Sequence, residues 1–389
     1  MNILLIEDQE NKITLVEELI RDNVEGDQCV IIKAKCLEQA RREIIGKSFD
    51  LIIFDIYLPL TPETNSEVVD ISLDIINEFS QSANNYQAET IAITQYDIED
   101  IDNMALFNQA GVPVVHFSEE DEKWKDPLRL KIKKITDRVK YDFLIFCALS
   151  KERLAFSNTN AEMGVLRTMY GLNCQDIKIG GCNGLCITPN NMGLINMAIS
   201  ASKAIEHFQP KIVSMSGICA GVEGEANLLD VIIGDLCWEY QTGKFKDNEF
   251  KQEPYQSPID GRIKVELEQL CESAEMLNNI KRGLFETELK DSKVFLGPIS
   301  SGSAVIADAK KMAEIGLQHR KMAGLEMEMY SLYEAARQSL CRPLYFGAKT
   351  VVDLGNTIKG DTLHSTGSTL SARLVTHYLE SKLPVLNMD

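Results

Sequence analysis

The chain has 389 residues, more than one hydrophobic core usually holds, so we expect two domains. Its 44% hydrophobic and 25% charged residues indicate a soluble globular protein, and a formal net charge of −18 disfavours binding to nucleic acid. An early charge at Glu7, apolar runs of only strand length and ten scattered cysteines predict a cytoplasmic protein with reduced thiols and with neither a secretory signal nor a membrane span.

Acidic residues are concentrated at the start of the chain. Residues 1–118 hold 22 acidic and 7 basic residues, a net charge of −15, which leaves −3 for the remainder. This difference indicates two modules with different electrostatic character. An anionic small molecule therefore fits the second module better than the first.

The first 118 residues alternate strand-like apolar runs with segments of helix length. The predicted strands are 2–6, 29–34, 50–55, 89–94 and 112–117, and the predicted helices between them are 9–22, 37–47, 66–81 and 97–110. Almost continuous apolar strands with helical crossovers are typical of a parallel sheet that is covered on both faces. The first module is thus expected to be a flavodoxin-like, doubly wound α/β domain.

Acidic side chains follow two of these predicted strands. Glu7 and Asp8 come after the first strand and Asp55 after the third, while Thr94 ends the fourth. The carboxyl ends of parallel strands meet at one edge of a sheet, where ligands bind. Three carboxylates there would repel one another unless a hard cation such as Mg²⁺ lay among them. Ordinary acidic loops on a doubly wound domain are the alternative.

These residues, with "DIYLP" from Asp55 onward, resemble the receiver domain of two-component response regulators. The resemblance implies that Asp55 is the phospho-acceptor, that Glu7, Asp8 and Asp55 hold Mg²⁺, and that Thr94 is the switch hydroxyl. It also implies a sensor histidine kinase or phosphotransfer protein as partner. The lysine that the family carries at the end of strand five is missing, and His116 or Ser118 stands there instead.

A charged segment, 119–140, separates the two modules. It contains Pro127 and then a basic helical pattern, which we interpret as the last receiver helix merging into a linker. The predicted domains are therefore a receiver at 1–122, a linker helix at 123–140 and a second domain at 141–389. Its apolar runs are 141–149, 211–221, 230–235, 293–302 and 343–353.

Glu328, in the stretch "AGLEMEMYSLYEAAR", is out of place in a helical reading. It falls on the apolar stripe with Leu325 and Leu332, although burying an unpaired carboxylate is costly. Either Glu328 lies in the first turn of the helix, where the dipole favours an acid, or the site needs a carboxylate.

Other short motifs of the second domain end in small residues or acids: "FCALSKE" with Glu152, "SGICAG", "GPISSGSAVI", "LEMEM" and "KTVVD". Gly and Ala at strand ends let backbone N–H groups approach a ligand closely. Together, from about 141 to 385, these motifs resemble the nucleoside phosphorylase superfamily. They are most similar to the nucleosidases that hydrolyse methylthioadenosine and S-adenosylhomocysteine, which implies an α/β fold with a central mixed sheet.

This resemblance assigns roles to individual residues. It implies that Glu328 accepts hydrogen bonds from the ribose hydroxyls, that Met327 packs against the sugar, that Asp353 protonates the purine at N7 and that Glu152 activates water. No cofactor is then required. The predicted pocket lining is Ala148, Leu149, Ile218, Cys219, Ala220 and Gly221. The alternatives are a solvated charge at the start of a helix for Glu152 and a loop cap for Asp353.

The choice between water and phosphate as nucleophile depends on basic residues. Phosphorolytic members carry arginines for inorganic phosphate, but the corresponding segment, 186–200, has no Arg or Lys, which favours hydrolysis. Lys349 and Lys359 are candidates for contacts with substrate phosphates, with surface solvation as the alternative.

A receiver joined to a nucleosidase resembles the effectors of the Detocs anti-phage defence systems. That resemblance implies hydrolysis of ATP or a related adenine nucleotide to adenine and ribose 5′-triphosphate, under receiver control, by a homo-oligomer. Two alternatives stay open at this point. One is a methylthioadenosine or S-adenosylhomocysteine nucleosidase under receiver control, and the other is a non-catalytic module that senses a nucleoside.

Overall fold

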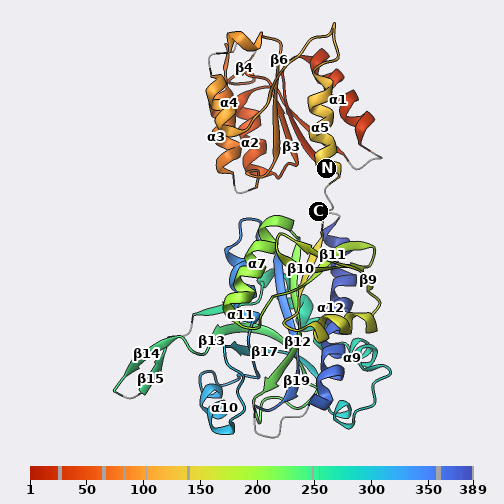
Figure 1. The fold of residues 1–389 in the computed structure, drawn as a ribbon, viewed down its shortest axis with the longest axis vertical. Helices are drawn as coiled ribbons and strands as arrows, with labels where there is room; N and C mark the ends of the chain where they lie inside the picture. Colours follow the sequence, from red (N-terminus) through yellow and green to blue (C-terminus); the bar gives the residue numbers. More distant parts are fainter. Residues whose placement is uncertain are drawn as a thin grey trace. The chain divides into compact units, whose positions relative to one another are not determined.

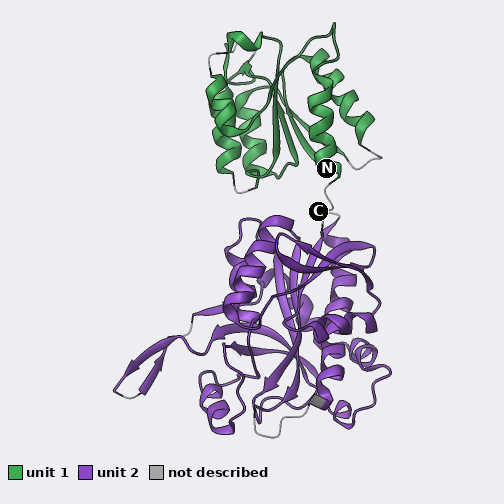
Figure 2. Ribbon diagram, in the orientation of Figure 1, with its two compact units in different colours: residues 1–139 green, residues 140–389 purple. Residues whose placement is uncertain are grey.

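The computed structural model describes residues 1–24, 29–63, 67–82, 84–101, 103–137, 141–247, 249–253, 255–355 and 361–387. The chain forms two compact units, Met1–Val139 (unit 1) and Lys140–Asp389 (unit 2), as Figure 2 shows. Among the described residues, we find no helix with the length and apolar character that a membrane span requires.

The sheet of unit 1 has five parallel strands in the order β2-β1-β3-β6-β7 (Figure 1). This order is that of a flavodoxin-like, doubly wound domain and confirms the predicted fold class. The strands are β1 (Asn2–Ile6), β2 (Val30–Ala34), β3 (Leu51–Phe54), β6 (Glu89–Thr94) and β7 (Val114–His116). The helices are α1 (Glu10–Asn23), α2 (Leu37–Gly46), α3 (Ser72–Gln81), α4 (Met104–Ala110) and α5 (Lys125–Thr136), with a short 3₁₀ helix at Ile98–Asp100.

Two predicted helices of unit 1, 66–81 and 97–110, are shorter than expected. In the second, a 3₁₀ helix at Ile98–Asp100 precedes α4, which begins only at Met104. Within the predicted helix 66–81, β5 (Val68–Asp70) pairs with β4 (Tyr57–Pro59), and α3 begins only at Ser72. The β-branched pair before Asp70 favours a strand. The Asp70 carboxylate then accepts hydrogen bonds from the N–H and hydroxyl of Ser72, which marks the start of the helix.

Alternation along β1 builds a core on each face of the sheet. Leu4 and Ile6 pack on the side of α2, α3 and α4, whereas Ile3 and Leu5 pack on the side of α1 and α5 (Figure 1). Helix α5 belongs to this second core through three buried residues, Leu128, Ile132 and Ile135. The segment that we expected to be a linker helix therefore packs as the last helix of unit 1.

Unit 2 is built on a mixed ten-stranded sheet, in the order β16-β13-β17-β18-β12-β8-β11-β10-β9, with β19 paired to both β12 and β13. The strands are β8 (Phe143–Phe146), β9 (Glu162–Met169), β10 (Leu172–Ile179), β11 (Cys182–Thr188), β12 (Ile212–Gly221), β13 (Val231–Glu239), β16 (Gln256–Pro258), β17 (Val294–Ser301), β18 (Gly324–Glu326) and β19 (Leu344–Asp353). A separate hairpin of β14 (Gly243–Lys246) and β15 (Glu249–Gln252) extends away from this sheet (Figure 1).

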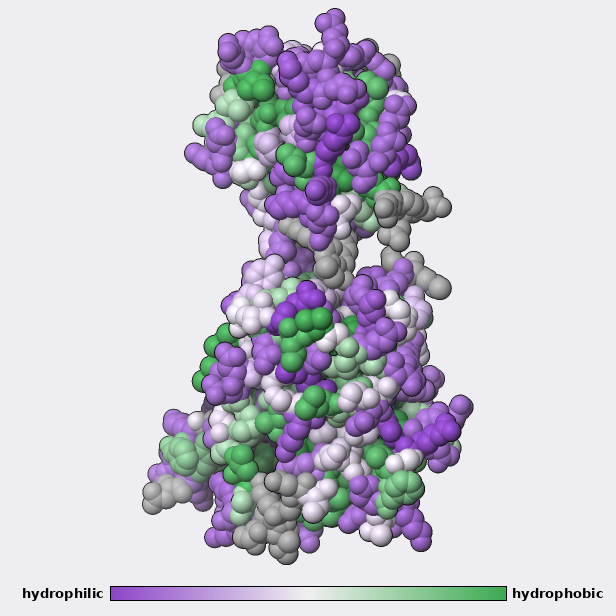
Figure 3. Space-filling view, turned by 45° about the vertical axis from the view of Figure 1, so that its right-hand side comes forward, coloured by the Kyte–Doolittle hydropathy of each residue, from purple (hydrophilic) through white to green (hydrophobic). Residues whose placement is uncertain are grey.

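Helices cover both faces of this sheet. They are α6 (Ser150–Leu154), α7 (Leu194–Phe208), α8 (Gly261–Glu272), α9 (Ala274–Lys281), α10 (Ala309–Gly316), α11 (Met329–Gln338) and α12 (His364–Leu386), with 3₁₀ turns at Ala155–Asn158, Thr287–Lys290 and Asp361–Leu363. Figure 1 shows α7 and α11 on one face and α12 on the other. On the face of unit 2 seen in Figure 3, apolar residues form small separate groups among polar ones.

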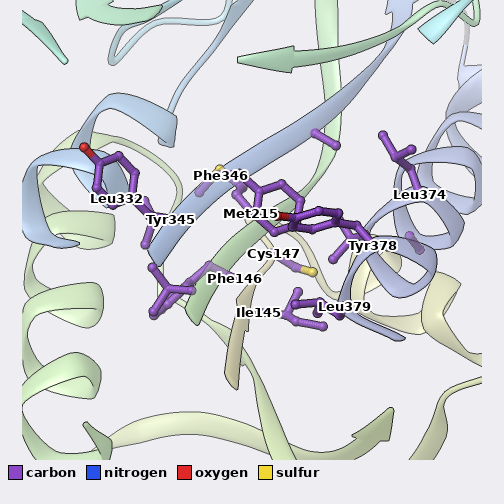
Figure 4. Packing of buried hydrophobic residues seen from close by; sticks show 14 of the residues in the cluster. Ile145, Phe146, Cys147, Met215, Leu332, Tyr345, Phe346, Leu374, Tyr378 and Leu379 are labelled. Atoms are coloured by element: carbon purple, nitrogen blue, oxygen red, sulfur yellow. The ribbon is translucent and has the colours of Figure 1, made fainter. Parts of the chain in front are cut away.

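The main core of unit 2 fixes the central strands against α12. Figure 4 shows Phe146 of β8, Met215 of β12 and Phe346 of β19 among these apolar side chains. The ring of Phe346 meets Tyr378 of α12 edge to face, with 5.0 Å between the ring centroids. Since β8, β12 and β19 run parallel, this packing also fixes the edge where their carboxyl ends meet.

Candidate active site

A cavity of about 180 Å³ lies at that edge of unit 2. Ten predicted residues line it: Ala148, Leu149, Glu152, Ile218, Cys219, Ala220, Met327, Glu328, Lys349 and Asp353. Gly221, also predicted, is not part of the lining, because it pairs with Gly324 in the β12–β18 ladder and faces the Val351 side chain. The lining residues that were not predicted individually are Met192, Ala304, Val305, Ile306, Leu325, Glu326, Val352 and His364.

Glu152 is held between two strand ends. It lies in α6, directly after β8, and only 1% of its surface is exposed, which excludes the alternative of a solvated charge. Its Oε2 accepts a hydrogen bond from the N–H of Leu149 at 2.9 Å, and its Oε1 accepts one from the N–H of Ile218 in β12, also at 2.9 Å. Two N–H donors stabilise the ionised carboxylate in this buried position.

Glu328 immediately precedes α11 and is 2% exposed. It therefore lies at the helix start rather than on an interior stripe. Its Oε1 accepts a hydrogen bond from the N–H of Gly193 at 2.9 Å, and its Oε2 lies 3.8 Å from Nζ of Lys349. Burial raises the pKa of Glu328 to about 7, although Lys349 opposes this rise.

Glu326 is the carboxylate that caps α11. Its side chain accepts hydrogen bonds from the N–H groups of Glu328 and Met329 at 2.9–3.0 Å, and one from the hydroxyl of Ser301. Because Glu326 supplies the cap, the Glu328 carboxylate can face the cavity. The sequence did not indicate this role, because it depends on how the chain turns into α11 and on Ser301, which is distant in sequence.

Lys349 is buried inside this acidic group. Its Nζ lies 3.3 Å from Oε2 of Glu326, and the neighbouring Glu326, Glu152 and Glu328 raise its pKa against the effect of burial. The ammonium therefore balances buried carboxylates. Lys349 lines the cavity with its charge engaged by carboxylates, and its contact with substrate phosphates stays a prediction. Lys359, the other candidate, lies outside the described residues.

Asp353 ends β19 and is partly buried. Its Oδ1 accepts a hydrogen bond from the N–H of Gly355 at 2.8 Å, as the loop-cap alternative requires. The same residue nevertheless lines the cavity together with Glu152 and Glu328. Asp353 can therefore both cap the loop and face a substrate in the cavity.

A second acidic group lies at the carboxyl edge of the sheet in unit 1. Glu7, Asp55 and Thr94 are buried there and Asp8 is partly buried. The N–H groups of Asp8 and Gln9 donate to Oε1 of Glu7 at 3.1 and 3.0 Å. Burial raises the pKa of Glu7 to about 7.

Lys12 of α1 completes this group, which sequence reasoning missed. Its Nζ lies 2.7 Å from Oε2 of Glu7, from Oδ2 of Asp55 and from the carbonyl oxygen of Ile93, and it faces the ring of Phe117. A lysine therefore reaches these acids from helix α1.

The arrangement around Lys12 bears on the expected Mg²⁺. This ion takes six oxygen ligands in near-octahedral geometry. Here the Lys12 ammonium fills the space between Glu7 and Asp55, and among the described residues no three His, Cys, Asp or Glu side chains are grouped to hold a metal. The side chains as they lie do not fit Mg²⁺, and Mg²⁺ binding by Glu7, Asp8 and Asp55 stays a prediction.

Comparison with known proteins gives a family for unit 2. The family described as "Phosphorylase superfamily" matches residues 142–377 and does not extend into unit 1. An uncharacterized protein of Sinorhizobium fredii, y4jS, is 26% identical over 412 residues, which cover 98% of this chain and 99% of that protein.

Two further similar proteins are named for an activity. The ATP nucleosidase Cap17 of Escherichia coli is 22% identical over 214 residues, which cover 52% of this chain and 42% of Cap17. The 5′-methylthioadenosine/S-adenosylhomocysteine nucleosidase of Helicobacter pylori has a similar fold, with a TM-score of 0.50 at 11% identity over 63% of this chain and all of that one.

Proposed function

Because the chain belongs to the phosphorylase superfamily, we propose that unit 2 is a nucleosidase that hydrolyses the N-glycosidic bond of an adenine nucleoside or nucleotide. The observation that carries this proposal is the grouping of Glu152, Glu328 and Asp353 in the lining of one cavity, from three separate parts of the chain. Bringing three carboxylates together is unfavourable in a purely structural site, so the grouping indicates a chemical use.

The three acids divide the reaction among them. Glu328 would accept hydrogen bonds from the ribose hydroxyls, and these donors would offset the cost of burying its carboxylate. Glu152, fixed by two N–H groups, would orient the attacking water and take its proton, while Asp353 would donate a proton to the purine. A base on one side and an acid on the other suits the oxocarbenium-like transition state of glycosidic cleavage.

Water is the nucleophile that the cavity favours. Phosphorolysis needs cations that are directed at inorganic phosphate. Among the described lining residues, only Lys349 and His364 are basic, and Lys349 is engaged by carboxylates. We therefore propose hydrolysis.

We propose ATP as the substrate, with support from the similarity to the ATP nucleosidase Cap17, of which this chain spans less than half. A second candidate is a methylthioadenosine or S-adenosylhomocysteine nucleosidase. Met192, Val305 and Ile306 favour this candidate, since they give part of the cavity wall an apolar surface that suits a thioether.

The test is chromatography of the purified protein with ATP, AMP, adenosine or methylthioadenosine. Adenine released from ATP would support the first candidate, and adenine from methylthioadenosine alone would support the second. If no substrate yields adenine while the nucleosides still bind, the protein is a sensing module and the proposed activity is wrong.

Unit 1 would then control this activity. We propose that Asp55 accepts a phosphoryl group from a sensor histidine kinase and that the response raises ATP cleavage in a homo-oligomer during phage infection. The sheet order of unit 1 and the acids at its carboxyl edge support this proposal. Incubation with acetyl phosphate should increase adenine release by the wild type but not by Asp55→Asn. Equal stimulation of both proteins would contradict it.

Adding one methyl group at Gly217 tests the role of Glu152. A Cβ at this position would lie 2.3 Å from Oε1 of Glu152, so Gly217→Ala must displace the carboxylate. We expect kcat to fall about 100-fold, because small misplacements of a reacting group are costly. Gly261→Ala is the matched control, since its Cβ meets nothing within 4 Å. A kcat within about twofold of the wild type for Gly217→Ala would contradict the role of Glu152.

The pKa of Glu328 predicts how activity depends on pH. The ionised carboxylate can accept a hydrogen bond from each ribose hydroxyl with a separate oxygen. Burial raises the pKa of this group to about 7. We therefore expect kcat/KM to rise with pH through about 7 on the acidic side of its profile. Lys349→Met should move this rise to higher pH, because Lys349 holds the pKa down. A profile that is the same in both proteins would assign the rise to another group.

A further inference from the structure

A second cavity adjoins the candidate active site. It has a volume of about 500 Å³ and shares one residue, His364, with the first cavity. Its lining is Lys151, Leu154, Ala155, Ser157, Asn158, His364, Ser365, Ser368 and Thr369. These residues come from α6 and the turn after it, and from the first turns of α12. A substrate that extends past His364 would therefore enter a differently built space.

The two cavities differ in charge. Four carboxylates line the first one, Glu152, Glu326, Glu328 and Asp353, whereas none of the described residues that line the second is acidic. Hydroxyls, an amide and the basic residues Lys151 and His364 replace them. In a chain with a net charge of −18, a donor-rich cavity without acids is suited to an anion.

The start of α12 lies at this cavity. The helix is 23 residues long and begins at His364, directly after the 3₁₀ turn Asp361–Leu363. Its dipole also favours an anion there. Independently of the helix end, Ser368 is 2% exposed and lines the cavity, yet its Oγ has no hydrogen-bond partner among the described residues. An unpaired buried hydroxyl costs free energy that a ligand oxygen would recover.

Lys151 of the second cavity contacts His364, the residue that lines both cavities. Its ammonium is hydrogen-bonded to Nδ1 of His364, across the boundary between α6 and α12. Lys151 directly precedes Glu152, so the anchoring of Glu152 also fixes where the lysine backbone lies. Two basic side chains in contact create a place where an anion is favoured.

We propose that this second cavity, with Lys151 and Ser368, binds the phosphate chain of a nucleoside 5′-polyphosphate whose base and sugar occupy the first cavity. The inference rests on the proposed function and adds to it the residues that select a polyphosphate. An apolar 5′-group would leave the Ser368 hydroxyl unpaired and Lys151 without an anionic partner.

The test compares kcat/KM for ATP, AMP and adenosine in the wild type, Lys151→Ala, Lys151→Arg and Ser368→Ala. We expect Lys151→Ala to lower the ratio of kcat/KM for ATP to kcat/KM for adenosine about 10-fold, the usual effect of losing one hydrogen bond to a charged group. Lys151→Arg should keep most of the wild-type ratio. The ratio isolates the phosphate contact, because any disturbance of the adjacent Glu152 lowers both values. Lys203→Ala, an exposed lysine of α7, is the matched control.

Inorganic tripolyphosphate gives a second readout that needs no turnover. It should raise the melting temperature of the wild type more than that of Lys151→Ala. If adenine is released but neither Lys151→Ala nor Ser368→Ala changes the ratio of kcat/KM for ATP to that for adenosine, this inference is wrong. The proposed nucleosidase activity would not be affected by that result. No adenine from any substrate would overturn the proposed function. If tripolyphosphate also failed to stabilise the wild type, the proposed phosphate site would be contradicted as well.

Discussion

Replacing Glu152 by glutamine is expected to lower kcat about 10²–10⁴-fold, the usual contribution of a general base. The substitution keeps the size of the side chain but removes the group that takes a proton from water. It also places an amide NH₂ against a backbone N–H, since both carboxylate oxygens now accept one, from Leu149 and from Ile218. We therefore expect a loss of unfolding free energy of about 1–3 kcal/mol as well.

Steady-state kinetics with ATP, together with thermal unfolding, would measure both effects. Glu162→Gln is the matched control, because Glu162 is an exposed carboxylate at the start of β9 and should change neither quantity. A Glu152→Gln enzyme that keeps its kcat would remove this residue from the mechanism, whatever its stability.

Replacing Lys12 by methionine should destabilise unit 1 by about 3–5 kcal/mol, since removal of one member of a buried ion pair leaves an uncompensated charge. Here two carboxylates, Glu7 and Asp55, would lose their shared partner, because each lies 2.7 Å from the Lys12 ammonium. Asp55→Asn in the same chain should restore part of the loss by removing one of those charges.

Urea unfolding would measure this effect, followed by the fluorescence of Trp124 in a chain whose other tryptophan, Trp238, is replaced by phenylalanine. Trp124 is buried in the same core as α1 and α5. Lys47→Met is the matched control, because Lys47 is exposed and its i,i+4 pair with Glu43 should contribute no more than about 0.5 kcal/mol. A loss as small for Lys12→Met as for Lys47→Met would mean that the buried pair stabilises nothing.

Most of the fold could be predicted because it depends on local patterns. Leu4 and Ile6 alternate with Ile3 and Leu5, and this period of two is visible in the sequence and decides the two faces of β1. The early end of the predicted helix 66–81 was less visible, because β5 is a three-residue strand that forms only against β4. Pairing of that kind depends on a partner distant along the chain.

The candidate site was predictable where a residue follows a strand, as Glu152 and Asp353 do. Glu326, His364 and Lys12 were missed for a different reason. Each acquires its role from a neighbour distant in sequence, such as Ser301 for Glu326 and Asp55 for Lys12. The contact of Lys349 with substrate phosphates was likewise predicted without its neighbours. The spacing of residues alone could not place the carboxylates that engage this lysine around it.

The three carboxylates around Lys349, which are Glu152, Glu326 and Glu328, also set a trade-off between stability and activity. One ammonium cannot balance them all, so the pocket holds repulsion that the folded chain tolerates only because the rest of unit 2 is stable. A nucleoside that donates hydroxyls to Glu328 relieves part of this repulsion, and binding energy is thus available to order the pocket. Substitutions that make the site less acidic would give a more robust protein and a poorer catalyst.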